Sequence, residues 1–152
     1  MADNGRKIIC VNKRARFDYE ISDVYEAGMV LQGTEVKSLR EGRVSLQDAY
    51  ADIQHGELYL LQAHIDQYEQ GNRFNHDPDR PRKLLLHKGE IRRLVGKTQE
   101  KGLTLIPTRM YFSHGKAKVE LGLAKGKKTY DKRQTLKRRT AEREIERALR
   151  GE

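Results

Sequence analysis

The carboxylates of Asp48, Asp52 and Glu57 are the groups in this sequence that could form a hydrolytic metal site. Asp48 and Asp52 are four residues apart in an alternating segment, so a strand would place both on one face, as a metal-dependent nuclease requires. The same spacing fits polar residues on the solvent face of a hairpin, which is the more common arrangement. We therefore predict no catalytic residue, and we keep the nuclease as a remote alternative.

Other chemical motifs are also incomplete. The five histidines are scattered, and the sequence has no cysteine pair and no His-x-x-x-His spacing for zinc. Gly122 and Gly126, followed by Lys127 and Lys128, are one residue too close for a phosphate-binding loop, and Lys128 stands where Ser or Thr would hold magnesium. We expect a protein that is not an enzyme and has neither a metal nor a cofactor.

The segment Asn12–Arg16 instead favours RNA binding. It combines an amide with three cations, and Phe17 and Tyr19 follow closely. Aromatic rings that stack on unpaired bases, beside cations that hold phosphates, are typical of single-stranded or looped RNA recognition. Phe17 and Tyr19 also fit a strand that alternates with Ile21, so core positions are the alternative, above all for Phe17.

The C-terminal segment Lys125–Glu152 is the most basic part of the chain. It holds eleven Lys or Arg and five Asp or Glu, and so it contributes most of the net charge of +9. Because it has few apolar residues to bury, we expect it to be disordered when free. A narrow apolar stripe that includes Ile145 and Leu149 predicts that it becomes helical when RNA neutralises its cations. A merely solubilising tail is the alternative.

Composition agrees with a polyanionic partner in a reducing compartment. The chain has 152 residues, which fits one domain and a tail, and a calculated isoelectric point near 9.7. The single cysteine, Cys10, excludes an internal disulfide and indicates the cytoplasm. No apolar run approaches the roughly 20 residues of a membrane span, so we expect no membrane partner.

These residues must be positioned by a small β-rich domain. We expect strands at 8–11 and 17–21, a helix at 34–42 with Thr34 as its N-cap, a hairpin at 46–62 and a helix ending before Gly102. A strand with Pro107 at an edge or bulge and a second hairpin turning at 113–116 complete the pattern. Between them, 69–82 is expected to be a functional loop, because Arg73, Arg80 and Arg82 could all meet the same anionic partner.

Many short antiparallel strands with two or three inserted helices predict a mainly β, OB-like barrel, with a two-layer α+β sandwich as the alternative. The predicted organisation is a flexible lead at 1–7, an RNA-binding barrel at 8–124 and a basic tail at 125–152. We expect a monomer.

Several sequence blocks together resemble the small protein B (SmpB) family of bacterial tmRNA-binding proteins. The blocks are Asn12-Lys13-Arg14-Ala15, Glu26-Ala27-Gly28, Glu35–Arg40, Arg82–Leu86 and Leu123–Lys128 with Asp131-Lys132-Arg133. The resemblance implies an oligonucleotide-binding-type barrel that binds the tRNA-like domain of tmRNA, also called SsrA RNA. It also implies delivery of that RNA, alanyl-charged and with elongation factor Tu–GTP, to stalled ribosomes for trans-translation.

The resemblance also implies site residues. It places Asn12, Tyr19, Glu26 and Leu85 on the tmRNA-contacting surface, to which we add the cations of the same blocks, Lys13, Arg14, Lys37 and Arg40. It implies that the tail acts at small-subunit rRNA, in the empty message channel near the decoding centre, through Gly126, Lys127, Lys128, Tyr130, Asp131, Lys132, Arg133, Lys137, Arg138 and Arg139. A general rRNA-binding assembly factor or RNA chaperone remains the alternative function.

Overall fold

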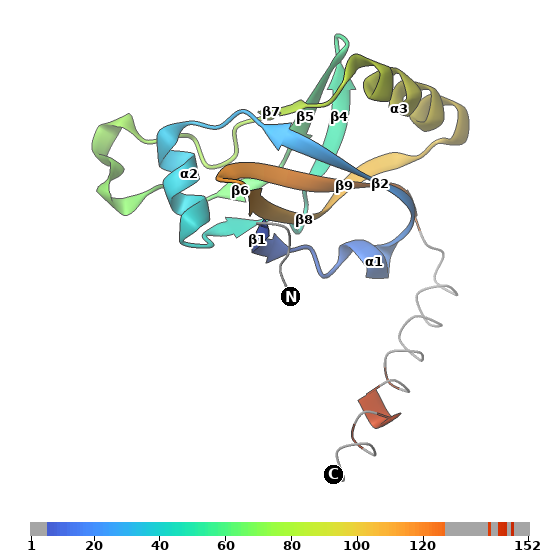
Figure 1. The fold of residues 1–152 in the computed structure, drawn as a ribbon, viewed down its shortest axis with the longest axis horizontal. Coiled ribbons are helices and arrows are strands. Elements are labelled where there is room, and N and C mark those ends of the chain that lie inside the picture. The colour runs from blue at the N-terminus through green and yellow to red at the C-terminus, as the bar shows by residue number, and fades with distance from the viewer. Residues whose placement is uncertain (1–5, 127–139, 141–142, 146, 148–152) are drawn as a thin grey trace.

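The computed structural model describes residues 6–126, 140, 143–145 and 147. In this part of the chain a β-rich body carries one helix at each of two ends (Figure 1). The elements are β1 Arg6–Val11, α1 Ala15–Asp18, β2 Tyr19–Met29, α2 Gly33–Arg40, β3 Val44–Ser45, β4 Tyr50–Gln54, β5 Glu57–Leu61, β6 His64–Ile65, the 3-10 helix η1 Glu69–Phe74, β7 Arg82–Leu85, α3 Lys88–Lys101, β8 Thr104–Ser113 and β9 Lys116–Gly126.

The strands form one antiparallel seven-stranded sheet in the order β1-β8-β4-β5-β7-β2-β9, and β9 also pairs with β8. The strands β8, β4, β5, β7, β2 and β9 therefore form a ring in which each strand pairs with the next and β9 pairs back to β8, as in a small barrel. One seam is thin, because β4 meets β8 through a single pair of residues, Ala51 and Leu105. The mainly β, barrel-like fold with inserted helices is confirmed, and the barrel is partly open.

Three long strands, β2, β8 and β9, form one continuous part of the barrel, in which β9 pairs with both β2 and β8. Strand β2 pairs with β9 from Tyr19 opposite Gly126 to Gly28 opposite Lys118. The register of β8 and β9 shifts between Pro107 and Arg109, so the proline lies at a bulge, as its missing N–H requires. The predicted hairpin turn between these strands is also confirmed.

Gly122 in β9 has a packing reason to lack a side chain. A Cβ at this position would lie 2.7 Å from Ile21 Cγ2 and 3.2 Å from Thr108 Cγ2. Its neighbours therefore fill the space on that face, which lets β2 and β8 both pack closely against β9.

The two longer helices lie near opposite ends of the sheet (Figure 1). Helix α3 buries Leu94 and ends at Gly102, whose φ of 63° is the left-handed conformation of a helix C-terminus. Helix α2 begins one residue before the expected Thr34 cap. Gln32 is its N-cap instead, and the backbone N–H of Gln32 donates to Glu35 Oε1 at 2.8 Å.

The core lies inside the barrel and continues under both helices. Ala27, Leu39, Leu58, Leu60, Ile65, Leu84, Leu94, Met110, Val119 and Leu121 are fully buried or nearly so. A second, smaller cluster of Ala15, Ile106 and Ala124 lies where β2 begins, and Tyr19, Ile21 and Tyr50 pack against it. This second cluster fixes the end of the barrel that carries α1.

Several local expectations were wrong. Phe17 lies in the single-turn helix α1, because the chain turns through Asn12–Ala15 before β2 starts at Tyr19. After the hairpin, residues 64–65 form a short strand that was not expected, β6, which pairs with β3 in a separate two-stranded sheet. Strand β1 starts at Arg6, inside the expected lead, and β9 runs two residues into the expected tail. In the part of the chain that the structure describes, no helix is long and apolar enough to cross a bilayer.

Candidate nucleic-acid interface

Strand β2 links the residues expected to contact RNA. Tyr19 starts this strand, Glu26 lies in its second half, and Gly28 pairs with Leu85 of β7. Nine residue steps of about 3.3 Å separate Tyr19 from Gly28, so the two ends of the surface are about 30 Å apart. The expected contacts therefore form two groups along one strand rather than one compact site.

Asn12 has a structural role at the first end. Its side chain is buried, and Nδ2 donates to the carbonyl oxygens of Leu46 at 3.1 Å and Pro107 at 2.9 Å. Because both amide hydrogens are used inside the protein, Asn12 cannot offer them to a base or a phosphate. It instead anchors the turn that places Lys13 and Arg14 at the surface.

Two cations follow Asn12 directly. Lys13 and Arg14 are exposed, and the Arg14 guanidinium lies 5.3 Å from the centre of the Phe17 ring. Arg14 also contacts Asp18 at 3.4 Å, a long and exposed ion pair that contributes little to stability. Arg14 is therefore available to exchange this weak partner for an RNA phosphate.

Glu26 lies on the outer surface of β2 in a cluster of polar side chains from three strands. Arg6 Nη2 donates to Glu26 Oε2 at 3.1 Å, and the Tyr111 hydroxyl donates to the same oxygen. Burial, with this hydrogen bond, raises the pKa of Tyr111 to about 12, so the phenol stays a donor at neutral pH. Within the described residues Oε1 of Glu26 has no partner, and the side chain is 40% exposed.

The neighbouring carboxylate on β9 is paired more fully. Glu120 lies directly opposite Glu26 in the sheet. Its two oxygens contact Arg109 Nη2 at 3.2 Å and the Thr108 hydroxyl at 2.5 Å. Both oxygens of Glu120 are occupied, whereas Glu26 has contacts through one oxygen, so Glu26 is the carboxylate that offers an acceptor to a ligand.

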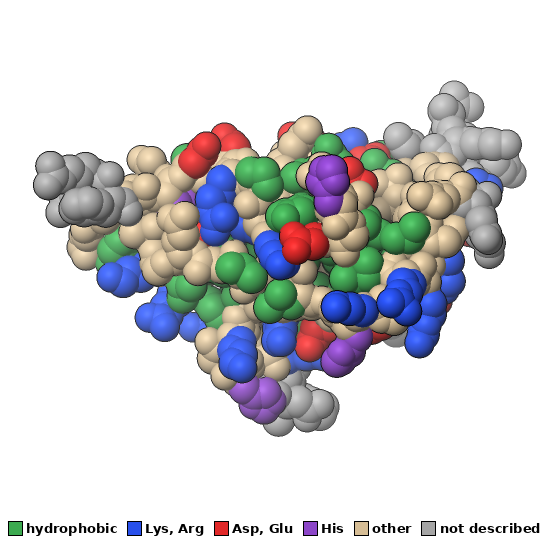
Figure 2. All heavy atoms as spheres, turned by 90° about the horizontal axis from the view of Figure 1, so that it is seen from above, with side chains coloured by type: hydrophobic (Ala, Val, Ile, Leu, Met, Phe, Trp, Pro, Cys, Tyr) green, Lys and Arg blue, Asp and Glu red, His purple; other side chains and the backbone are tan. Residues whose placement is uncertain are grey.

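Exposed apolar side chains flank Glu26. Val24 is 50% exposed, Val30 46% and Leu85 53%, and all three belong to β2, its end or its partner strand β7. Figure 2 views the molecule from the side on which β7 and α3 lie in Figure 1. It shows hydrophobic side chains in the middle of this face, interspersed with charged ones of both signs, and further Lys and Arg toward its edges. A surface of this kind suits unstacked bases held between phosphate contacts.

Lys37 and Arg40 are exposed on α2, as expected. The Lys37 ammonium lies 5.4 Å from the centre of the Tyr68 ring. Glu35 of the same helix is completely buried, so the side of α2 that carries it faces the protein interior.

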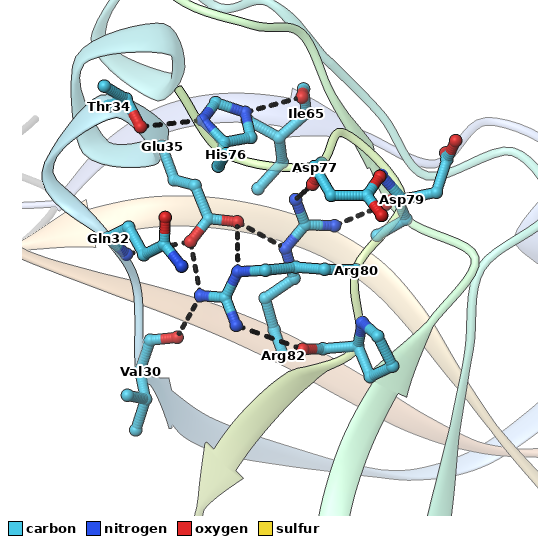
Figure 3. A network of polar contacts seen from close by, with 12 residues as sticks. Val30, Gln32, Thr34, Glu35, Ile65, His76, Asp77, Asp79, Arg80 and Arg82 are labelled. Carbon is cyan, nitrogen blue, oxygen red and sulfur yellow. Dashed lines mark hydrogen bonds and ion pairs between the residues drawn. The ribbon is translucent and has the colours of Figure 1, made fainter. Parts of the chain in front are cut away.

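The arginines expected to meet an anionic partner from the loop at 69–82 are used inside the protein, so that expectation was wrong. Arg82 is completely buried, and its Nε donates to Glu35 Oε2 at 2.7 Å while Nη1 donates to Ala63 O at 2.7 Å (Figure 3). Arg80 Nη2 contacts Glu35 Oε1 at 2.5 Å. The side chain of Arg73 lies outside the described residues.

The same network explains His76. Its Nε2 donates to the carbonyl oxygen of Ile65 at 2.9 Å, so its Nδ1 accepts from the Thr34 hydroxyl, also at 2.9 Å (Figure 3). The buried imidazole thus ties the start of α2 to β6. It is a structural histidine rather than a ligand.

The carboxylates of the nuclease alternative do not converge. Asp52 accepts from the backbone N–H of Ile53, and Glu57 is paired with Tyr59 and Lys83. Among the described residues no group of three or more His, Cys, Asp or Glu could hold a metal ion.

Most tail residues named from the sequence lie outside the described part of the chain. These are Lys127, Lys128, Tyr130, Asp131, Lys132, Arg133, Lys137, Arg138 and Arg139. Gly126 is described, and it is the last residue of β9, opposite Tyr19. The tail therefore begins beside the first group of expected RNA contacts.

Arg6 and Tyr111 are the residues that the sequence did not single out. Strand periodicity alone places neither one beside Glu26, because the contact depends on β1, β2 and β8 coming together in the barrel. Correct strand pairing would have been the signal needed to find them.

Comparison with known proteins gives a consistent result. The family model described as "SmpB protein" matches residues 9–151. The chain is 63% identical over 151 residues to an SsrA-binding protein of Desulforudis audaxviator, covering 99% of each chain, and 63% identical over 145 residues to that of Carboxydothermus hydrogenoformans, covering 95% and 97%. A chain of the solved structure "tmRNA-SmpB: a journey to the center of the bacterial ribosome" is 57% identical, with a TM-score of 0.67 over 79% of this chain and 85% of that one.

Proposed function

This chain belongs to the SmpB family, and from that premise we propose that it binds tmRNA through the tRNA-like domain and delivers it to stalled ribosomes. The observation that carries the proposal is identity of 63% along 99% of both chains to an SsrA-binding protein. The likeness to a chain from a tmRNA–SmpB–ribosome structure supports the same partners. Small-subunit rRNA, alanyl-charged tmRNA and elongation factor Tu–GTP are the further partners that we propose.

The barrel supplies the specificity in this proposal. Exposed cations such as Lys13, Arg14, Lys37 and Arg40 neutralise phosphates and set the orientation of the RNA. A carboxylate repels phosphate, so Glu26 must instead accept from a base or a ribose hydroxyl. Leu85 supplies apolar contact area beside it. Asn12 acts indirectly, by holding the turn that carries Lys13 and Arg14.

The tail supplies the ribosome contacts in this proposal. Its cations neutralise rRNA phosphates, and its apolar stripe becomes one face of a helix in the message channel. Delivery of RNA needs no bond to be made or broken by the protein, so we propose that the protein works in the cytoplasm as a monomer without catalysis. An RNA-cleavage assay with and without a metal chelator tests the absence of nuclease activity.

A competition assay tests tmRNA binding. The full chain is bound to labelled tRNA-like domain at fixed salt and challenged with unlabelled tRNA-like domain or with bulk tRNA. We expect at least a tenfold preference for the tRNA-like domain. Equal competition by the two RNAs would instead support a general assembly factor or RNA chaperone.

A truncation tests the division between barrel and tail. Ending the chain after Gly126 keeps all of β9 paired with β2 and removes the segment proposed to act on the ribosome. We expect tmRNA affinity to stay within a few-fold of the full chain and peptide tagging on stalled ribosomes to be lost. Loss of tmRNA affinity as severe as the loss of tagging would contradict this division.

A further inference from the structure

A groove runs between α3 and the β4–β5 hairpin, which lie side by side in Figure 1. It consists of two hollows of about 370 and 380 Å³ that share Val95 as a wall. The first opens beside Gly56 in the turn of the hairpin, and the second lies between β4, the second half of α3 and the start of β8. The eleven residue steps from Lys88 to Gln99, at about 1.5 Å each, make the groove about 17 Å long, which is room for about five residues of extended chain.

The floor of the groove is aliphatic. Ile53 of β4, Ile91 and Val95 of α3, and Leu103 line it and are half-buried. Ile53 and Leu103 also pack against the main core, so this apolar surface continues the core outward. Among the described residues that line the end beside Gly56 there is no aromatic ring, so an unpaired base would find nothing there on which to stack. The groove therefore suits aliphatic side chains better than RNA.

One wall of the groove is the edge of β4, which has almost no strand partner on this side. β4 meets β8 only through Ala51 and Leu105. Past that pair, the backbone N–H of Ile53 donates to Oδ1 of Asp52 at 2.9 Å, so a side chain accepts the hydrogen bond that a neighbouring strand would accept. A free strand edge is a template for pairing with another chain, and a charged side chain is a common protection for it. Because peptides are often recognised by adding a strand to such an edge, this wall favours an extended partner.

The rim of the groove carries cations that the protein does not use. Lys88 and Arg92 line the end beside the hairpin turn, and both are exposed. They are four residues apart, so they lie on the same side of α3. Neither makes a hydrogen bond or an ion pair within the described part of the chain. Charge complementarity therefore favours an acidic occupant. A second copy of this chain, with a net charge of +9, and its own basic segment Lys125–Glu152 both have the wrong charge.

We propose that this groove binds an extended, acidic segment of a protein partner, in which acidic and aliphatic residues alternate. The segment adds a strand to the edge of β4, and its aliphatic side chains pack against Ile53, Ile91 and Val95. Its carboxylates lie near Lys88 and Arg92. None of the described residues that line the groove belongs to the set proposed to contact tmRNA, so the protein partner and the RNA should bind at the same time.

A synthetic peptide tests the groove. The probe is a capped octapeptide in which glutamate alternates with valine, titrated into the full-length, isotope-labelled protein and followed by NMR. We expect the amide signals of Ile53, Gly56, Ile91 and Val95 to shift, with a dissociation constant below about 1 mM. Serine in place of valine removes the aliphatic contacts and should weaken binding about tenfold or more. Lysine in place of glutamate, or N-methylation of the whole peptide backbone, should abolish binding, because the first reverses the charge and the second removes the N–H donors.

Two neighbouring arginines of α3 provide a matched pair of variants. Arg92→Glu and Arg93→Glu make the same change in charge, and both side chains are exposed, but only Arg92 lines the groove. We expect Arg92→Glu to weaken binding of the glutamate–valine peptide about 3- to 10-fold, because one attractive contact becomes repulsive. Lys88→Glu should do the same, whereas Arg93→Glu should stay within about twofold of the parent. All three variants should bind the tRNA-like domain equally well.

Each contrary result overturns the proposal. The groove does not bind such a segment if its amide signals stay unchanged up to about 1 mM peptide, or if the lysine–valine peptide binds as tightly. Strand addition at β4 is wrong if the N-methylated peptide binds like the parent peptide. Equal weakening by Arg92→Glu and Arg93→Glu would reduce the effect to overall charge. A loss of affinity for the tRNA-like domain with Lys88→Glu and Arg92→Glu, but not with Arg93→Glu, would assign the groove to RNA instead of protein.

Discussion

Two glutamates of this protein each meet arginine, and they are used in opposite ways. Glu35 on α2 is completely buried, and both of its oxygens accept hydrogen bonds, from Arg80, Arg82 and the backbone of Gln32 (Figure 3). Glu26 on β2 is 40% exposed, and one oxygen takes both of its contacts while the other has no partner among the residues that the structure describes. The first cluster is complete without a ligand, and the second is not.

The difference shows how to separate structural from functional charge in an RNA-binding protein. A buried carboxylate must satisfy its hydrogen-bonding capacity internally, because removal from water is costly. An exposed carboxylate on a basic surface has no such requirement, and it works against phosphate binding. Its presence there is explained when a base or ribose donor fills the open acceptor position.

The largest effect is expected from breaking the buried cluster. Glu35→Ala leaves the Arg82 guanidinium buried without its counter-charge, which costs roughly 3–5 kcal/mol of unfolding free energy. At about 3–5 °C per kcal/mol for a body of this size, the melting temperature should fall by about 10–20 °C. Thermal unfolding followed by circular dichroism measures this. A fall of only 1–2 °C would show that the cluster contributes little to the fold.

The second-largest effect is expected from the cluster of Glu26 with Arg6 and Tyr111. It should lower RNA affinity and not the stability of the fold. Glu26→Ala removes an acceptor for a charge-assisted hydrogen bond, which is worth roughly 1.5–3 kcal/mol. We therefore expect about 10- to 150-fold weaker binding of the tRNA-like domain, measured by filter binding at fixed salt. The melting temperature should change by no more than a few degrees, because the side chain is already partly in water.

Glu57 provides the matched control for Glu26. It is also an exposed strand glutamate with a tyrosine and a cation, but Tyr59 donates to Oε2 at 2.7 Å and Lys83 to Oε1 at 3.2 Å, so both oxygens are occupied. Glu57→Ala should leave the RNA affinity within about twofold of the parent. Equal losses from Glu26→Ala and Glu57→Ala would show that the open oxygen is irrelevant to binding.

A smaller effect, the pH dependence of the melting temperature, is expected from the buried cluster. Burial opposes ionisation of Glu35, but hydrogen bonds from Arg80, the Gln32 backbone and Arg82 outweigh it and lower its pKa below the usual 4.5. A carboxyl with a lowered folded-state pKa stabilises the protein above its unfolded pKa, and this stabilisation is lost as the pH falls through the folded value. The melting temperature of the parent should therefore fall below pH 4.5.

Glu35→Gln is the control for the acid effect, because it cannot titrate. The gap in melting temperature between the parent and Glu35→Gln should narrow below pH 4.5 and stay constant from pH 5 to pH 8. A gap that stays the same at every pH would mean that ionised Glu35 contributes no stability.

The sequence predicted the larger features of this fold because they depend on local periodicity. Helix α3 has its apolar positions on one side and Gly102 at its end, and the hairpins have glycine in their turns, so each element could be located from its own residues. Phe17 was placed wrongly for the same reason. Its alternation with Tyr19 suggested a strand, but the internal hydrogen bonds of Asn12 fold this segment into a turn.

The arginines show where such reading of a sequence fails. Arg80 and Arg82 look like the exposed cations at Lys13 and Arg14, since each lies near prolines or other polar residues with no apolar period. Only the distant Glu35, 45 and 47 residues away, decides that they are internal. The partners of Glu26 are likewise remote, because Tyr111 is 85 residues away. Charge in a sequence predicts a partner, but long-range pairing decides whether that partner is the protein itself.

The smallest expected effect is a change in the salt dependence of RNA binding, and it compares cations that are free to meet RNA with cations already paired inside the protein. Each phosphate that Lys37 or Arg40 neutralises releases condensed counterions, so its loss should reduce the slope of log K against log salt by about 0.7–0.9. Lys37→Gln and Arg40→Gln should each lower the slope by about that amount and weaken binding only a few-fold near physiological salt. Lys83→Gln is the control, because the Lys83 ammonium is already paired with Glu57 at 3.2 Å. A slope that falls as much for Lys83→Gln as for Lys37→Gln would mean that internal pairing does not decide which cations meet the RNA.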